Sequence, residues 1–324
     1  MNRRDAVAAI AGLAAVSALR AQSPPVRRVG ILGAGSRTAS PHIYAGFKER
    51  MKALGWVEGR NVEYVELVAD GYMERLDGLA KEMVGRKVDV IVAGPPPSAV
   101  AAHKATRTIP IVMGNVPDPV ALGLVASLAR PGGNVTGVAS QTTALVGKEI
   151  ELLKEIVPGA KRLGVLVNSR NPNANAFRTV AANAAASLRL VVEFADADRP
   201  EAIDAAVAQV AKAGAQIVAV PADPMMLGER RRLNEAIART RLPAAFGNRD
   251  HAMDGGLISY APDIVANFRL AAGFVDRILR GASPAGLPVE QSDKIELVVN
   301  LKTAKSLGIS IPRSVLARAD EVIE

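Results

Sequence analysis

Cysteine is absent from all 324 residues of this chain, and aromatic residues are scarce. The lack of cysteine excludes disulfides, thiol nucleophiles and thiolate metal sites, and it is compatible with export to an oxidising compartment. Aromatic residues make up only 3% of the chain, whereas hydrophobic residues make up 49%. A core built from Ala, Val, Leu and Ile is typical of helices packed on buried parallel strands. The composition therefore indicates an α/β protein with one or two packed cores.

Long apolar runs are also missing, except for one near the N-terminus. Arg3 and Arg4 precede an uncharged run at residues 6–19, and the small residue Ala21 stands before Gln22. A charged start, an apolar segment too short to cross a bilayer and a small residue at its end are typical of a signal peptide, here residues 1–21. The paired arginines also permit twin-arginine export, so both Sec and Tat remain open. A soluble N-terminal helix is the alternative interpretation.

The basic residues give a net charge of +8, but they do not form a nucleic-acid surface. They are scattered, apart from Arg230–Arg232, and no aromatic residues are interleaved with them. We interpret them as solvated faces and expect no nucleic-acid partner. The three histidines fall in separate segments without metal-ligand spacing, and the glycines at 33 and 35 lack the third glycine of a dinucleotide fingerprint. We therefore expect no metal and no cofactor.

The rest of the chain repeats a strand–loop–helix unit in two successive halves. Short apolar runs predict strands, and apolar periodicity between Gly and Pro signals predicts the helices that follow them. The expected strands are residues 29–32, 62–68, 88–93, 111–113 and 135–139, then 163–167, 190–194, 217–220, 244–247 and 257–260, with a last one at 294–299. The expected helices include residues 41–54, 73–85, 120–128, 145–156, 230–240, 263–279 and 303–307. This pattern predicts two α/β lobes that face a cleft.

Several loops after these strands carry polar residues. Asp118 and Asp223 lie in matching prolyl turns after late strands of the two halves. They are candidates for ligand binding because ligands of open α/β sheets sit at the carboxyl ends of strands. Stabilisation of the turn is the alternative role for each. Ser98, after Pro95–Pro97, is expected to cap the next helix, which would turn its hydroxyl and the following amides toward the cleft.

Specific motifs spread over nearly the whole mature chain resemble those of one family. They are LGWVEGRN at residues 54–61, KVDVIV at 87–92, DPV at 118–120, SLARPGGNVTG at 127–137, ELLK at 151–154, GGLISY at 255–260, NLKTAK at 300–305 and ARADEVI at 317–323. The chain resembles ABC transporter substrate-binding proteins with the type I periplasmic-binding-protein fold, in the tryptophan/tyrosine-type subfamily. The resemblance implies two Rossmann-like lobes with parallel sheets, joined by three crossovers that act as a hinge. We expect an N-terminal lobe of residues 26–141 plus about 260–284, and a C-terminal lobe of residues 142–259 plus about 285–324.

The resemblance also implies where a ligand would bind, in the cleft between the lobes. The implied ligand-binding residues are Ser36, Thr38, Ser98, Ala99, Asp118 and Ser140 from the first lobe, and Asn168, Asn171, Asp223 and Asn248 from the second. For an amino acid, one of the two aspartates would pair with the ammonium, and helix N-terminal amides near Ser98 and Ala99 would bind the carboxylate. The loops offer little aromatic surface to enclose a ring, and Tyr44 and Phe246 are the nearest candidates.

By this resemblance the protein is an extracytoplasmic, periplasmic solute-binding protein and not an enzyme. It would capture a small polar molecule, with an amino acid or a related organic acid favoured, and deliver it to the permease subunits of an ABC transporter. A monomer is expected. A ligand-sensing accessory protein or a degenerate α/β enzyme of the same fold is the alternative.

Overall fold

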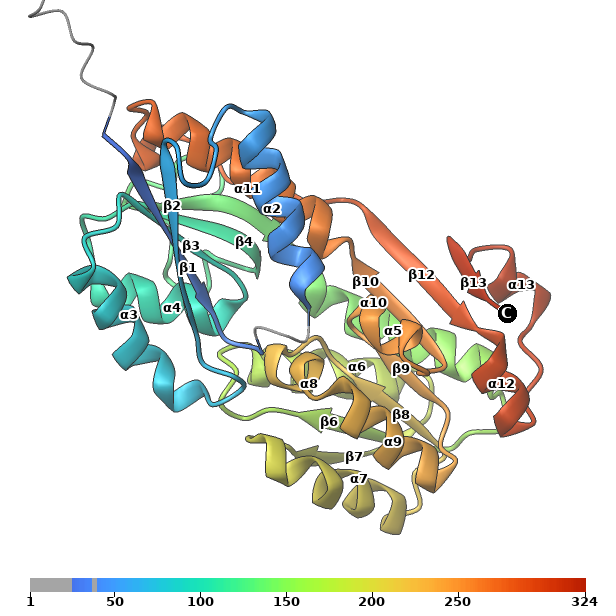
Figure 1. Cartoon of the computed structure of the whole chain (residues 1–324). Helices are drawn as coiled ribbons and strands as arrows, with labels where there is room; N and C mark the ends of the chain where they lie inside the picture. The colour runs from blue at the N-terminus through green and yellow to red at the C-terminus, as the bar shows by residue number, and fades with distance from the viewer. Residues whose placement is uncertain (1–24, 37–39) are drawn as a thin grey trace, which may run out of the picture.

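The computed structural model describes residues 25–36 and 40–324. The expected signal peptide at residues 1–21 and the candidate Thr38 lie outside the described residues. The chain forms two α/β lobes, each built around its own sheet (Figure 1). No helix in the described part of the chain combines the length and the apolar character that crossing a bilayer requires.

The N-terminal lobe contains a six-stranded sheet in the order β11-β5-β4-β3-β1-β2, in which every pairing is parallel. Its strands are β1 (Arg27–Gly33), β2 (Val62–Val68), β3 (Val90–Ala93), β4 (Ile111–Pro117), β5 (Val135–Ser140) and β11 (Glu290–Gln291). Its helices are α2 (Pro41–Ala53), α3 (Leu76–Gly85), α4 (Pro96–Ala105) and α11 (Ile264–Leu279), with 3-10 turns η1 (Met73–Arg75) and η3 (Pro284–Gly286). Helices α2 and α11 cover one face and α3 and α4 the other, so the central strands are buried on both sides.

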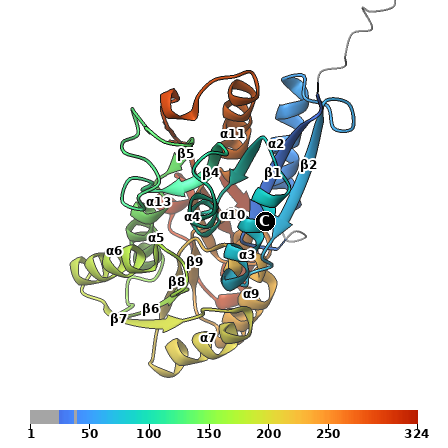
Figure 2. The same cartoon turned by 90° about the vertical axis from the view of Figure 1, so that its left-hand side faces the viewer.

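The C-terminal lobe contains a seven-stranded sheet in the order β13-β12-β10-β9-β8-β6-β7, parallel except for the β10–β12 pair. Its strands are β6 (Arg162–Val167), β7 (Val191–Asp196), β8 (Ile217–Val220), β9 (Ala244–Phe246), β10 (Ile258–Pro262), β12 (Ile295–Asn300) and β13 (Glu321–Ile323). Its helices are α5 (Thr142–Ile156), α6 (Ala174–Ser187), α7 (Ile203–Lys212), α8 (Pro224–Gly228), α9 (Arg230–Thr240), α10 (Arg249–Met253), α12 (Leu301–Leu307) and α13 (Arg313–Leu316), with the 3-10 turn η2 (Pro200–Ala202). Helices α5 and α6 pack side by side on one face (Figure 2), and α7 and α9 pack on the other.

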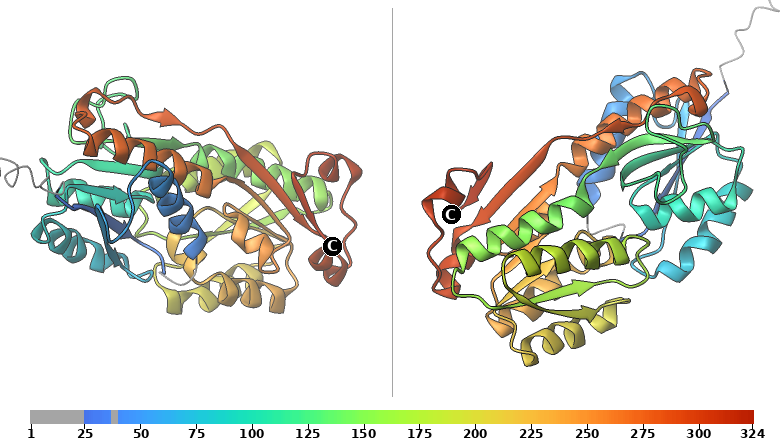
Figure 3. Two further views of the ribbon diagram at one scale, coloured as in Figure 1. Left: turned by 45° about the horizontal axis from the view of Figure 1, so that its top comes forward. Right: turned by 180° about the vertical axis from the view of Figure 1, so that it is seen from behind.

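The chain crosses between the two lobes three times. It passes from β5 to α5, from β10 to α11 and from β11 to β12. Figure 3 shows the last crossing as the orange-red strand that runs from one lobe to the other. The fold class is therefore the one expected, two Rossmann-like lobes with a three-crossover hinge. Strand β11 adds residues 290–291 to the N-terminal sheet, beyond the expected end of that lobe near residue 284.

The expected helix at residues 120–128 is wrong, because this segment forms a series of turns. Gly123 within the segment has φ 68°, and Asp118, two residues before the segment begins, has φ 45°. Both values lie in the left-handed region, which a right-handed helix cannot contain. The apolar side chains Leu124 and Val125 are nevertheless buried in the core. The apolar spacing of this segment therefore reflects burial of a non-helical backbone.

The expected helix cap at Ser98 is also wrong. Helix α4 begins two residues earlier, with Pro95 at the cap position, and the Ser98 amide donates to the Pro95 carbonyl at 3.1 Å. Proline suits the first turn of a helix because it lacks the N–H that would be unpaired there. Ser98 is fully buried inside the helix, and its hydroxyl has no hydrogen-bond partner in the described structure.

Candidate functional site

A cavity of ≈ 90 Å³ lies between the lobes, where loops after strands of both sheets meet. Its walls are mostly apolar, and they include Ile43, Pro95, Pro96, Pro117, Leu227 and Ile264. The polar side chains that line it are Ser36, Ser40, Tyr44, Asn115, Thr142, Asn171, Asp223 and Asn248. Among the described lining residues, Asp223 is the only one with an acidic or basic side chain. An apolar cavity with few convergent polar groups is the usual form of a small-molecule site.

Asp223 is held rigidly at the start of helix α8. Its Oδ1 accepts hydrogen bonds from the amides of Met225 at 2.9 Å and Met226 at 3.1 Å, which caps the helix. The side chain is almost fully buried, and burial raises its pKa, while the bonds from its neighbours act in the opposite direction. A cation in the cavity would favour the ionised form, because it would replace the lost hydration of the carboxylate.

A short turn after strand β6, which we call the 168–171 turn, holds the other side of this carboxylate. Asn171 donates to Oδ2 of Asp223 at 2.9 Å, and Asn168 donates to both oxygens at 3.2 and 3.3 Å. The turn closes on itself, because the amide of Asn171 donates to the carbonyl of Asn168 at 3.0 Å and the amide of Arg170 donates to Asn168 Oδ1 at 3.0 Å. The orientation of Asp223 thus depends on two asparagines of one turn.

Three aromatic rings line the cavity, and they come from helices rather than loops. Tyr44 of α2 packs edge-on against Phe268 of α11 with centroids 5.5 Å apart, and Phe177 of α6 reaches the cavity from the other lobe. Burial, with a smaller effect of Glu66, raises the pKa of Tyr44 to about 12, so its phenol is neutral. The expectation of little aromatic surface was drawn from the loops; it named Tyr44 as a nearest candidate but missed Phe177 and Phe268. Phe246 does not line the cavity; it is buried and stacked on a histidine ring at 4.5 Å.

Asparagine side chains supply further polar groups. Asn267 donates to Oδ1 of Asn115, a lining residue of the cavity, at 2.8 Å. Asn248 is buried, and its side chain makes no capping bond to helix α10, although it stands at the cap position. Side-chain amides can both donate and accept hydrogen bonds, so Asn115 and Asn248 can bind either acceptor or donor groups of a ligand.

Four of the nine candidate residues that the structure describes line the cavity. These are Ser36, Asn171, Asp223 and Asn248. Asn168 and Ser140 lie one contact away, since Asn168 holds Asp223 and the Ser140 hydroxyl bonds the Thr142 hydroxyl at 2.8 Å. Ala99 and Ser98 are buried in α4 away from the lining, and Asp118 is exposed and accepts a hydrogen bond from the amide of Ala121 at 3.1 Å. The lining residues outside the candidate set include Gly94, Pro95 and Ala222 in loops after strands, and others on helices α2, α6 and α11.

The two lobes touch around the cavity. The Ser40 hydroxyl and the His42 ring contact Asp250 of the C-terminal lobe at 3.0 and 3.3 Å. Buried apolar residues of both lobes also form one continuous cluster, in which Ala69 and Ala197 take part. Within the described residues, no group of acidic and histidine side chains could hold a metal ion.

These features define a two-lobed binding protein of the periplasmic type, and comparison with known proteins identifies its family. Residues 28–323 match the family model described as ABC transporter substrate binding protein, and the chain belongs to this family. The family consists of solute-binding transport proteins that act outside the cytoplasm and work with ABC permeases; its function is binding rather than catalysis.

Individual relatives agree with this family. The Tyrosine-binding protein of Clostridioides difficile (strain R20291) is 29% identical over 265 residues, 82% of this chain and 76% of that protein. A conserved domain protein from Vibrio cholerae superposes with a TM-score of 0.86 at 30% identity, over 92% of this chain and 99% of that one. An ABC domain in complex with L-Trp from Streptococcus pneumoniae gives a TM-score of 0.84 at 26% identity, over 92% and 100% of the two chains.

A further relative, solved without a ligand, superposes less well on this chain. The ligand-free, open structure of a substrate-binding protein with adhesive properties from Clostridium difficile is 25% identical over 92% of this chain and 99% of its own, but its TM-score is only 0.62. The L-Trp complex has nearly the same identity and a TM-score of 0.84. The present structure as a whole therefore superposes better on the L-Trp complex than on the open form.

Proposed function

We propose that this protein binds an α-amino acid with a large apolar side chain, aromatic ones above all, and presents it to an ABC permease. The observation that carries the proposal is the buried carboxylate of Asp223 in a cavity whose walls include Tyr44, Phe177 and Phe268. Relatives point the same way, since one is named a tyrosine-binding protein and another was solved with L-Trp.

In this proposal each part of the ligand has its own partner. Asp223 pairs with the ammonium, since a buried carboxylate favours a cation that replaces its hydration. The rings of Tyr44, Phe177 and Phe268 pack around the side chain, where aromatic pairs add to simple burial. Ser36, Asn171 and Asn248 complete the proposed site. An organic acid without an ammonium would leave Asp223 facing another anion, which argues against that class of ligand.

The remaining assignments follow from the family and the sequence. We propose that residues 1–21 are removed as an export signal, that the mature protein works as a monomer in the periplasm, and that residues near 141, 262 and 292 are the hinge between the lobes. Mass spectrometry of the exported protein would locate the new N-terminus, and an N-terminus well before residue 22 would contradict the proposed signal.

Binding should be measured by calorimetry on residues 22–324 with L-tyrosine, L-tryptophan and L-phenylalanine. Two analogues separate the parts of the ligand: tyramine lacks the carboxylate, and 3-(4-hydroxyphenyl)propionic acid lacks the ammonium. We expect the propionic acid to lose binding entirely. Replacing Asp223 by Asn should weaken amino-acid binding roughly ten- to hundredfold, the usual value of a hydrogen bond to a charged group.

The matched control is Asp118→Asn, which changes an exposed aspartate outside the cavity and should leave the affinity unchanged. Affinity should also fall in acid, as protonation of Asp223 through its raised pKa removes the anion. Equal binding of tyrosine and the propionic acid would refute the role of Asp223, and no binding of any amino acid would refute the proposed ligand class.

A further inference from the structure

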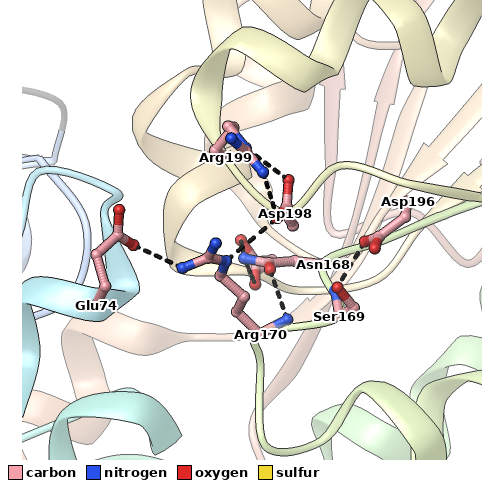
Figure 4. A network of polar contacts seen from close by, with 8 residues as sticks. Glu74, Asn168, Ser169, Arg170, Asp196, Asp198 and Arg199 are labelled. Atoms are coloured by element: carbon pink, nitrogen blue, oxygen red, sulfur yellow. Dashed lines mark hydrogen bonds and ion pairs between the residues drawn. The ribbon is translucent and has the colours of Figure 1, made fainter.

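An ion pair crosses between the lobes at Arg170, close to the proposed binding site (Figure 4). Arg170 belongs to the 168–171 turn of the C-terminal lobe, and its Nη1 lies 3.0 Å from Oε2 of Glu74 in η1 of the N-terminal lobe. Its Nε donates to Asp198 at 3.2 Å, and Arg199 binds the same carboxylate at 3.0 and 3.1 Å. The guanidinium therefore connects a carboxylate of its own lobe with one of the opposite lobe.

The backbone of Arg170 connects this ion pair to the cavity. Its amide donates to Asn168 Oδ1 at 3.0 Å, and this bond leaves the amide nitrogen of Asn168 directed at Asp223, to which it donates at 3.2 and 3.3 Å. Figure 4 shows Asn168 beside Arg170 in this network. Three consecutive contacts thus join Glu74 of one lobe to the carboxylate in the cavity.

The neighbouring Ser169 is fixed as well, because its amide donates to Asp196 at the end of strand β7 at 2.9 Å. A second polar contact crosses the same gap, from the Tyr72 hydroxyl to Glu201 at 2.8 Å. The 168–171 turn is therefore tied to its own sheet, and the side chain of Arg170 is its contact with the opposite lobe. Separation of the lobes would break the Glu74 contact and keep the contact with Asp198.

We propose that Arg170 is a positioning residue for ligand capture. Arg170 is not among the residues that line the cavity. Its pairing with Glu74 stabilises the closed lobes and at the same time fixes the turn that orients Asp223. Closure of the lobes and the orientation of the Asp223 carboxylate are therefore coupled. This inference rests on the proposed function for its ligand, an amino acid bound at Asp223. The pair is partly exposed, with side-chain exposures of 39% for Arg170 and 53% for Glu74, so its effect is modest and screened by salt.

The test uses Glu74→Gln, which removes the contact between the lobes and leaves Arg170 with Asp198. Asp77→Asn is the matched control, because Asp77 is an exposed acid on the next turn of the same lobe with no ion-pair partner in the described structure. L-Tyrosine and L-tryptophan are the probes, with affinity from calorimetry and dissociation rate from stopped-flow fluorescence. We expect Glu74→Gln to raise the dissociation rate and the Kd about two- to fivefold at low salt.

Three readouts separate positioning from a merely structural role. The difference between Glu74→Gln and the wild type should vanish in 1 M NaCl, Arg170→Gln should cost less in the Glu74→Gln background than alone, and Arg170→Lys should recover part of the loss. Unchanged affinity and dissociation rate in Glu74→Gln would overturn the inference while leaving the proposed function intact.

If no amino acid binds the wild type, the proposed function fails and the inference is judged on small-angle X-ray scattering alone. Glu74→Gln should then have a larger radius of gyration than Asp77→Asn. Identical scattering of the two variants would overturn the inference.

Discussion

Replacing Glu149 by glutamine should stabilise this protein, and the gain should increase as the pH is raised. Glu149 lies on α5 with no exposed surface, and neither of its carboxyl oxygens has a hydrogen-bond partner in the described structure. Burial raises its pKa well above the ordinary value of 4.5. Burying a charge without a partner is so costly that the group stays protonated instead.

The magnitude follows from proton linkage. Above pH 4.5 the unfolded chain releases the proton of Glu149, whereas the folded chain keeps it up to the raised pKa. The free energy of unfolding therefore falls by about 1.4 kcal/mol for each pH unit from pH 4.5 up to the raised pKa. Glutamine has nearly the same shape and cannot ionise, so it loses no stability in this way. The melting temperature of Glu149→Gln should therefore rise relative to that of the wild type by roughly 2 °C for each pH unit in this window.

The assay is the difference in melting temperature between variant and wild type at pH 5, 6, 7 and 8 at constant ionic strength. Taking the difference is necessary because His251 has the opposite effect. Burial, and to a smaller extent Arg230, lowers its pKa to about 3, so the unfolded chain binds a proton below pH 6.5 that the folded chain refuses. This contribution is the same in both proteins and cancels. The control is Glu235→Gln, which changes an exposed glutamate and should give no pH-dependent difference. A difference for Glu149→Gln that does not change with pH would refute the reasoning.

Four further substitutions test two glycine positions, a buried histidine and a ring of the cavity. Gly137→Ala should lower the free energy of unfolding by several kcal/mol in urea titrations, because φ is 125° and a new Cβ would stand 2.3 Å from the Met113 carbonyl oxygen. Gly147→Ala should instead raise the free energy of unfolding by up to about 1 kcal/mol, because its Cβ would meet only ordinary contacts at 3.8 Å or more. Equal effects of the two substitutions would contradict the argument. In the same titrations, the free energy of unfolding of His251→Gln should rise relative to that of the wild type by about 1.4 kcal/mol for each pH unit below 6.5. If the free energies of the two proteins instead change with pH in parallel, the histidine is protonated in the folded protein. Phe268→Leu should weaken calorimetric binding of aromatic amino acids more than that of leucine, whereas an equal loss for both would mean that the ring does not contact the ligand side chain.

The lobes and most strands could be predicted because buried parallel strands leave a plain pattern. Residues 111–113 and 217–220 are uninterrupted apolar runs, and each coincides with a strand that is buried on both faces. An apolar pattern does not predict secondary structure where the backbone conformation of a single residue interrupts a helix. Residues 120–128 have the apolar spacing of a helix, but Gly123 adopts a left-handed conformation that the sequence alone does not reveal.

The candidate site was predictable where it lies on loops. Asp223 and Asn171 follow the ends of strands, and the topology brings such loops to one edge of the sheet. The sequence pointed to Tyr44 as a nearest aromatic candidate but not to Phe177 or Phe268, since the three rings meet only because helices from two lobes converge. Glu149 is a similar case. A glutamate in a helix is usually solvated, and its burial depends on how α5 packs against the sheet.

The three crossings between the lobes also constrain when this chain can fold during its synthesis. The N-terminal lobe needs α11, from residues 264–279, to cover its sheet, and the C-terminal sheet needs β12 and β13, which end at residue 323. Neither lobe is therefore complete until nearly the whole chain has left the ribosome. Contacts between residues so far apart form slowly, because a long loop must close before they contribute. Both lobes therefore depend on residues from the last fifth of the chain, and the complete fold can form only when synthesis is nearly finished.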